Sequence, residues 1–203
     1  TEAQDAIALL DHLGLNRAAI LGTSRGGLIA MTLAAFAKER LSGGCLVDIG
    51  PELPEAGLEV IRNYIGKNPG QKTYADATAM RAQLLAGFVD VPQSRWNEEV
   101  RKHYIETSDG LKINYDPALR DAVLAAADQP MPDLWPLFDA LQDLPLALIR
   151  GENSDLLTQD TAQKMRARRS DMVFADVPDR GHVPFLDEPI ALQALGAWLA
   201  LIK

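Results

Sequence analysis

The stretch AAILGTSRGGLIAM, residues 18–31, places a serine at the point where a buried strand gives way to a helix. Four apolar residues lead into Gly22-Thr23-Ser24-Arg25-Gly26, and small and apolar residues follow. A serine with a glycine two positions away on each side, between a strand and a helix, is typical of a strained turn that lifts the hydroxyl above a sheet edge. We therefore interpret Ser24 as a nucleophile. The alternative interpretation is a serine that only caps the helix N-terminus.

A serine hydroxyl is a poor nucleophile unless a base accepts its proton, so the three histidines of the sequence are the candidates for that base. His12 falls on the first predicted helix, close to its core-facing side, and His103 lies in the charged segment WNEEVRKHY. His182 lies in VPDRGHVPFLDEP, a loop between the last predicted strand and the last predicted helix. We expect His182 to be the base, and the backbone N–H of Arg25 to face a developing oxyanion.

A catalytic histidine also needs an acid that holds its tautomer. Asp155 follows a buried strand in GENSDLLT and is the preferred candidate. Asp48, which ends the strand in LVDIG, is the alternative acid. The preferred chain order is therefore Ser24, Asp155, His182, with each residue after a different strand.

The N-terminal and C-terminal parts of the chain, residues 1–50 and 144–203, share an α/β pattern. Continuous apolar runs predict buried strands, and apolar residues at helical spacing predict helices between them. Such strands predict a mostly parallel sheet with helices on both faces. The predicted strands are 17–22, 44–49, 145–150 and 172–177, and the predicted helices are 2–13, 25–39, 158–168 and 188–202.

Residues 51–143 differ from this pattern and predict an all-helical insertion between two parts of one core, residues 1–50 and 144–203. Apolar periodicity continues through the insertion, and turn signals such as Asn-Pro and Asp-Gly interrupt it. The predicted helices are 55–65, 73–87, 95–106, 117–127 and 133–142.

Composition excludes several function classes. The formal net charge of −8 argues against partners that are nucleic acids or anionic membranes. The single cysteine, Cys45, rules out an intrachain disulfide, and the N-terminal residues are too polar for a signal peptide. We expect a cytoplasmic protein. Metal-binding spacings and nucleotide-binding loops are absent from the sequence, so we expect no metal and no cofactor.

Four stretches together resemble the α/β-hydrolase fold superfamily: DAIALLDHLGLNRAAILGTSRGG, LVDIGPEL, LIRGENSDLLT and VPDRGHVPFLDEP. The resemblance implies that residues 51–143 form a lid that shapes a substrate pocket. It implies a serine hydrolase acting on a carboxylic ester, lactone or thioester of a small molecule through an acyl-enzyme. The alternatives are a carbon–carbon bond hydrolase or a cofactor-free perhydrolase on the same triad. A non-catalytic binding module on this fold is the alternative from another class.

One departure concerns the start of the chain. Members of the superfamily usually have further strands before the helix that corresponds to residues 2–13, and one of the early loops supplies a second oxyanion N–H. The sequence therefore resembles the C-terminal two thirds of a hydrolase. We expect the strand at 17–22 to need a partner from the missing N-terminal part of the sheet, in the same gene product or in another chain.

Overall fold

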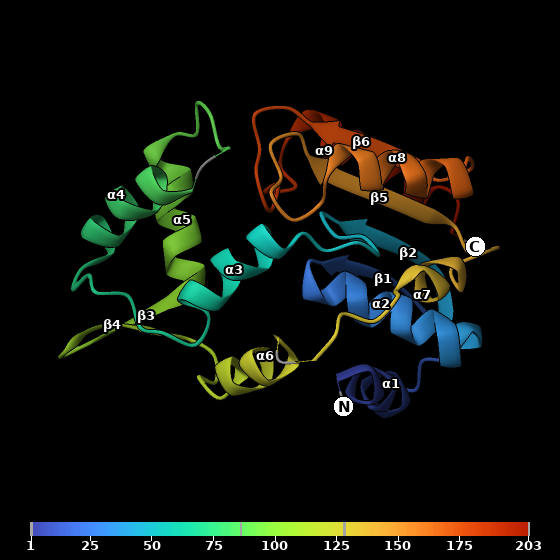
Figure 1. Ribbon diagram of the computed structural model, residues 1–203, viewed down its shortest axis with the longest axis horizontal. Coiled ribbons are helices and arrows are strands. Elements are labelled where there is room, and N and C mark those ends of the chain that lie inside the picture. The colour runs from blue at the N-terminus through green and yellow to red at the C-terminus, as the bar shows by residue number, and fades with distance from the viewer. Residues whose placement is uncertain (1, 86, 128, 203) are drawn as a thin grey trace. The chain divides into compact units, whose positions relative to one another are not determined.

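The computed structural model describes residues 2–85, 87–127 and 129–202, which divide into two compact units (Figure 1). The core unit comprises Thr1–Pro54 and Asp133–Lys203, and the second unit comprises Glu55–Pro132. The predicted insertion extends further, to residue 143. The two divisions differ there because Leu141 is fully buried in the core unit, where its Cδ2 lies 3.4 Å from the position that a Cβ on Gly44 would take.

A four-stranded parallel sheet forms the centre of the core unit, as predicted. Its order is β1-β2-β5-β6, so each new strand is added on the same side of the preceding one. The strands are β1 (Ala18–Thr23), β2 (Leu41–Val47), β5 (Leu146–Gly151) and β6 (Val173–Val177).

The described residues of the core unit form five helices. Four of them are the helices predicted for the core, in the same order but shorter, and the fifth corresponds to the helix predicted at 133–142 as part of the insertion. The five are α1 (Glu2–His12), α2 (Arg25–Phe36), α7 (Trp135–Asp139), α8 (Gln159–Arg168) and α9 (Pro189–Leu199), with a 3-10 turn at Lys38–Arg40.

Within the described part of the chain, no helix combines the length and the apolar character needed to cross a membrane. The cytoplasmic location stays a prediction.

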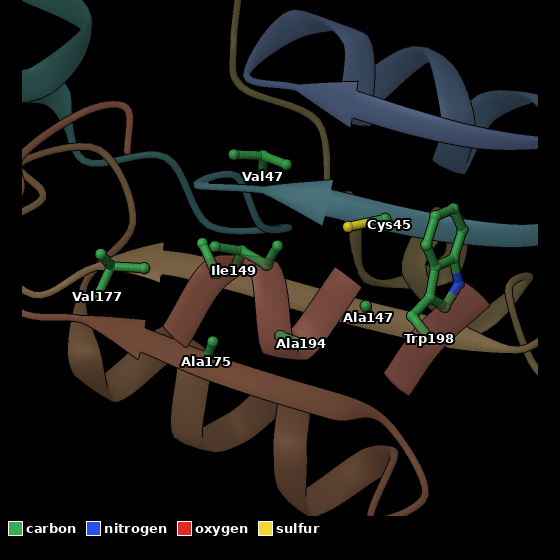
Figure 2. Close-up of a cluster of buried hydrophobic side chains, with 9 residues drawn as sticks. Cys45, Val47, Ala147, Ile149, Ala175, Val177, Ala194 and Trp198 are labelled. Carbon is green, nitrogen blue, oxygen red and sulfur yellow. The ribbon is translucent and has the colours of Figure 1, made fainter. Parts of the chain in front are cut away.

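Both faces of the sheet are covered, which explains why its strands read as continuous apolar runs. Cys45 and Val47 of β2 belong to a buried cluster with Ala194 and Trp198 of α9, and Figure 2 shows this cluster. Leu46, between them, points to the opposite face, where its Cδ2 would lie 3.3 Å from a Cβ on Gly27 of α2. Burial also raises the pKa of the Cys45 thiol to about 12, so Cys45 is a protonated core residue.

Strand β1 forms one edge of the sheet. Among residues 2–85, 87–127 and 129–202 its only strand partner is β2. Leu21 on this strand is 42% exposed. The expected partner strand on the outer side of β1 stays a prediction.

The second unit is not all-helical, which corrects the prediction for this segment. It contains α3 (Glu55–Tyr64), α4 (Tyr74–Leu84), α5 (Gln93–His103) and α6 (Leu119–Ala127), and also an antiparallel hairpin of β3 (Tyr104–Thr107) and β4 (Gly110–Ile113). The predicted helix 73–87 extends past Leu84, and residue 86 lies outside the described residues.

The hairpin forms because its turn is stabilised locally and one of its faces is buried. Thr107 Oγ1 donates to the carbonyl of Gly110 at 2.8 Å, and Gly110 adopts a φ of +119°, which favours glycine. Leu111 is buried against Ala77 and Val100 of the neighbouring helices. The Asp-Gly signal that we interpreted as a break between helices is therefore the tip of a hairpin.

Candidate active site

Ser24 lies in the turn between β1 and α2, with φ +49° and ψ −117°. A non-glycine residue at positive φ is strained by roughly 1–3 kcal/mol, and such strain persists only where the surroundings fix it. The Ser24 N–H donates to the Val47 carbonyl at 2.9 Å, and the Gly27 N–H donates to the Ser24 carbonyl at 2.8 Å. These bonds hold the turn against β2 and against the first turn of α2.

Two glycines make this turn possible, and only one of them belongs to the pair that the sequence pattern indicated. A Cβ on Gly22 would lie 2.4 Å from the carbonyl carbon of Gly26, and a Cβ on Gly27 would lie 2.3 Å from Ile49 Cγ2. A Cβ on Gly26 would meet none of the described atoms within 4 Å. The steric requirement therefore falls on Gly22, as predicted, and on Gly27, which the pattern did not single out.

Three side chains from three strand ends form one hydrogen-bonded chain. Ser24 Oγ lies 2.9 Å from His182 Nε2, and His182 Nδ1 lies 2.7 Å from Asp48 Oδ2. Ser24 follows β1, Asp48 follows β2, and His182 lies in the loop between β6 and α9. Parallel strands end at the same edge of a sheet, so these residues meet although more than 130 positions separate Asp48 from His182.

The carboxylate that contacts His182 is Asp48, the alternative candidate for the acid, and not Asp155, the preferred one. Asp48 is fully buried, whereas Asp155 is exposed in the loop between β5 and α8. The loop turns so that Ser154, one position earlier, reaches Asp48, with Ser154 Oγ 2.6 Å from Asp48 Oδ2. A signal for Asp48 was present in the sequence, because a carboxylate that directly follows a fully buried strand requires a hydrogen-bonded partner.

The contacts of Asp48 fix the tautomer of His182. The Gly151 N–H donates to Asp48 Oδ1 at 2.7 Å. An ionised carboxylate only accepts hydrogen bonds, so His182 Nδ1 carries the proton toward Asp48. His182 Nε2 is then the free acceptor and takes the hydrogen bond of the Ser24 hydroxyl. The arrangement can draw the proton from Ser24 when its oxygen attacks an electrophile.

The loop after β5 and the loop that carries His182 are fixed to each other by their backbones. The Asn153 N–H donates to the Arg180 carbonyl at 2.8 Å, and the Glu152 N–H donates to the Val177 carbonyl at 2.9 Å. A Cβ on Gly151 would lie 2.4 Å from the Gly181 carbonyl oxygen, so this close approach requires glycine. These contacts fix the loop that carries His182 against the loop after β5, whose Gly151 contacts Asp48.

Arg25, the residue after Ser24, is the first residue of α2. Its N–H is therefore one of those that a helix leaves without an intrahelical partner. The Arg25 side chain points to a different contact, an exposed ion pair with Glu2 of α1 at 2.7 Å. The backbone of Arg25 is thus free to act in the predicted role while its side chain joins α1 to α2.

The other two histidines lie outside this arrangement. His12 is exposed at the end of α1. His103 belongs to the second unit, where its Nδ1 lies 2.7 Å from the Glu99 carbonyl oxygen. Burial, with the positive charge of Arg81, lowers the pKa of His103 and favours its neutral form.

A model of the α/β hydrolase family matches residues 1–194 of the chain. The chain belongs to this family. Its fold class confirms the resemblance that the sequence motifs indicated.

Named relatives of this α/β hydrolase include two enzymes. It is 32% identical over 194 residues to the 3-hydroxybutyrate-oligomer hydrolase of Cupriavidus necator, a match that covers 91% of this chain and 66% of that protein. It is 24% identical over 195 residues to the 2-(acetamidomethylene)succinate hydrolase of Mesorhizobium japonicum, covering 95% of this chain and 68% of that protein. The chain thus spans about two thirds of the length of these relatives.

A solved structure shows the same fold. The α/β hydrolase from Novosphingobium aromaticivorans superposes on this chain with a TM-score of 0.87 at 35% sequence identity. The superposition covers 98% of this chain and 71% of that one.

Proposed function

We propose that this α/β hydrolase is a serine hydrolase that cleaves a carboxylic ester of a small molecule through an acyl-enzyme. The observation that carries the proposal is the chain of hydrogen bonds from Ser24 through His182 to Asp48. A binding module without catalysis has no need of a strained serine that contacts a buried histidine–carboxylate pair, so this arrangement favours an enzyme.

The reaction follows from the direction of these hydrogen bonds. Ser24 Oγ attacks the ester carbonyl carbon while its proton passes to His182 Nε2, and Asp48 stabilises the imidazolium. The Arg25 N–H donates to the oxyanion of the tetrahedral intermediate. When the C–O bond breaks, His182 returns the proton to the leaving alcohol. A water molecule then attacks the acyl-enzyme by the same steps, and releases the acid and free Ser24.

The substrate class that we propose is a short aliphatic oligoester of a hydroxy acid. The support is the 32% identity to an enzyme named for hydrolysis of 3-hydroxybutyrate oligomers. A lactone or thioester presents the same carbonyl carbon to Ser24 and is accommodated by the same steps.

The test combines covalent labelling with product analysis. A fluorophosphonate should label Ser24, detected by peptide mass spectrometry, because it phosphonylates an activated serine. The unlabelled protein should release 3-hydroxybutyrate from its dimer or trimer, and the fully labelled protein should not. Labelling at Ser24 with no ester or thioester turnover would overturn the substrate class, and absence of labelling would overturn the mechanism.

We also propose that the outer edge of β1 pairs with a strand from residues outside this sequence, which would supply a second oxyanion donor. The exposed edge of β1 and the greater length of the relatives support this. One oxyanion donor is worth about 10²- to 10³-fold in turnover. We expect the missing segment to have roughly 60–90 residues, the length of a few strand–helix units. A protein with this segment before residue 1 should turn over substrate faster than residues 1–203 alone, by that factor. Equal turnover of p-nitrophenyl butyrate would contradict the proposal.

A further inference from the structure

Ser154 lies beside Asp48, in the loop after β5 that also carries Asp155. Its hydroxyl oxygen lies 2.6 Å from Asp48 Oδ2, the same oxygen that lies 2.7 Å from His182 Nδ1. The two contacts converge on one carboxylate oxygen. Ser154 therefore contacts the proposed base, His182, through one intervening residue, Asp48.

The remaining contacts of Ser154 leave its hydroxyl only one direction for its proton. Ser154 Oγ accepts the N–H of Leu156 at 3.2 Å and the N–H of Leu157 at 3.0 Å. A hydroxyl has two acceptor sites and one donor, so these N–H groups occupy both acceptor sites. The hydroxyl proton is then directed to Asp48, and Ser154 can donate to the carboxylate but cannot accept a proton from it.

Within the described part of the chain, three groups contact the Asp48 carboxylate, and each of them is a donor. The Gly151 N–H reaches Oδ1, and the Ser154 hydroxyl and His182 Nδ1–H reach Oδ2. Three donors on its two oxygens hold the carboxylate in one orientation and prevent its rotation.

We propose that Ser154 is a positioning residue that keeps the Asp48 carboxylate oriented, and through Asp48 fixes the tautomer of His182. The inference rests on the proposed serine hydrolase function and adds a residue to it. It assigns the loop after β5 the task of orienting the acid.

The loop is anchored in a way that suits this task. Arg150, which is 5% exposed, donates from its Nε to the Leu157 carbonyl at 2.8 Å and from its Nη1 to Asp176 Oδ1 at 2.8 Å. Arg150 thereby holds Leu157 in place, and the Leu157 N–H is one of the two that donate to Ser154 Oγ. The orientation of Ser154 is thus supported by Arg150, which forms a partly buried ion pair with Asp176 between β5 and β6.

The first experiment measures kcat and KM for p-nitrophenyl butyrate in the active protein. Ser154→Ala should lower kcat roughly 10- to 100-fold, the loss expected for one hydrogen bond to a charged group. The KM should change less than about threefold, because Ser154 does not contact the substrate. Ser154→Thr, which keeps the hydroxyl, should restore kcat to within about threefold. Asp155→Ala, in the same loop but exposed, is the matched control and should stay within about twofold.

The second experiment separates this role from general support of the loop. If Ser154 acts through the Asp48 carboxylate, then Ser154→Ala should lower kcat less than about threefold further in an Asp48→Asn protein. An equal factor in both backgrounds, or an unchanged kcat in Ser154→Ala alone, would overturn the inference. Ser24→Ala distinguishes the two levels: if it retains activity, the proposed function fails, whereas if it is inactive and Ser154→Ala is neutral, only the role of Ser154 fails.

Discussion

Replacement of Ser24 by alanine is expected to lower the turnover of p-nitrophenyl butyrate by about 10³-fold or more. The substitution removes the oxygen that attacks the carbonyl carbon, and no acyl-enzyme can form without it. It leaves the backbone strain nearly unchanged, because alanine and serine both carry a Cβ at the φ of +49° that this turn imposes. The loss should therefore appear in kcat and in fluorophosphonate labelling, and not in the thermal midpoint of unfolding.

The matched control is Ser170→Ala, at an exposed serine between α8 and β6. It should keep kcat within about twofold of the unsubstituted protein. Retention of the full rate by Ser24→Ala, measured on protein purified away from host esterases, would rule out Ser24 as the nucleophile and with it the proposed mechanism.

The core strands could be predicted from the sequence because burial on both faces leaves a local signal. In β2, Cys45 faces α9 and Leu46 faces α2, so neighbouring positions are both apolar and the strand reads as an uninterrupted run. The same holds for β5, where every residue from Leu146 to Gly151 is buried. Only the first and last residues of the strands differ from the predicted ones, because hydrogen bonding to a neighbouring strand decides where a strand ends.

The hairpin of the second unit was missed because its signal is not local. Tyr104 and Ile105 continue the apolar spacing of α5, and only pairing with β4 shows that the helix has ended at His103. Ile105 is 51% exposed, so the strand lacks a clear alternation of buried and exposed residues. Cross-strand contacts decide this segment, and a single sequence does not reveal them.

The acid was ambiguous for a similar reason. Asp48 directly follows β2, and Asp155 lies in the loop after β5. Both strands end at one edge of the sheet, so chain order alone fits either residue. The choice depends on the turn after Gly151, which directs Ser154 toward Asp48 and leaves Asp155 exposed. A difference of one position in a loop reverses which side chain points inward, and spacing in the sequence does not resolve it.

Asp48→Asn should lower kcat by about 10³- to 10⁴-fold, the second large effect that we expect. The asparagine amide can present an N–H to His182 Nδ1, which then becomes the acceptor, so the ring proton moves to Nε2 and the Ser24 proton has no base. Asparagine also tolerates the φ of +55° at this position, so the fold should be preserved and the thermal midpoint little changed.

Asp155→Asn is the control that decides between the two acids. Its carboxylate is exposed, and the structure gives it no part in the contacts of His182, so kcat should stay within about twofold. A large loss in Asp155→Asn with a small one in Asp48→Asn would mean that the loop after β5 changes its conformation in the active protein. Losses of equal size would mean that both carboxylates contact His182 during turnover. The ratio of the two effects therefore measures directly which strand supplies the acid.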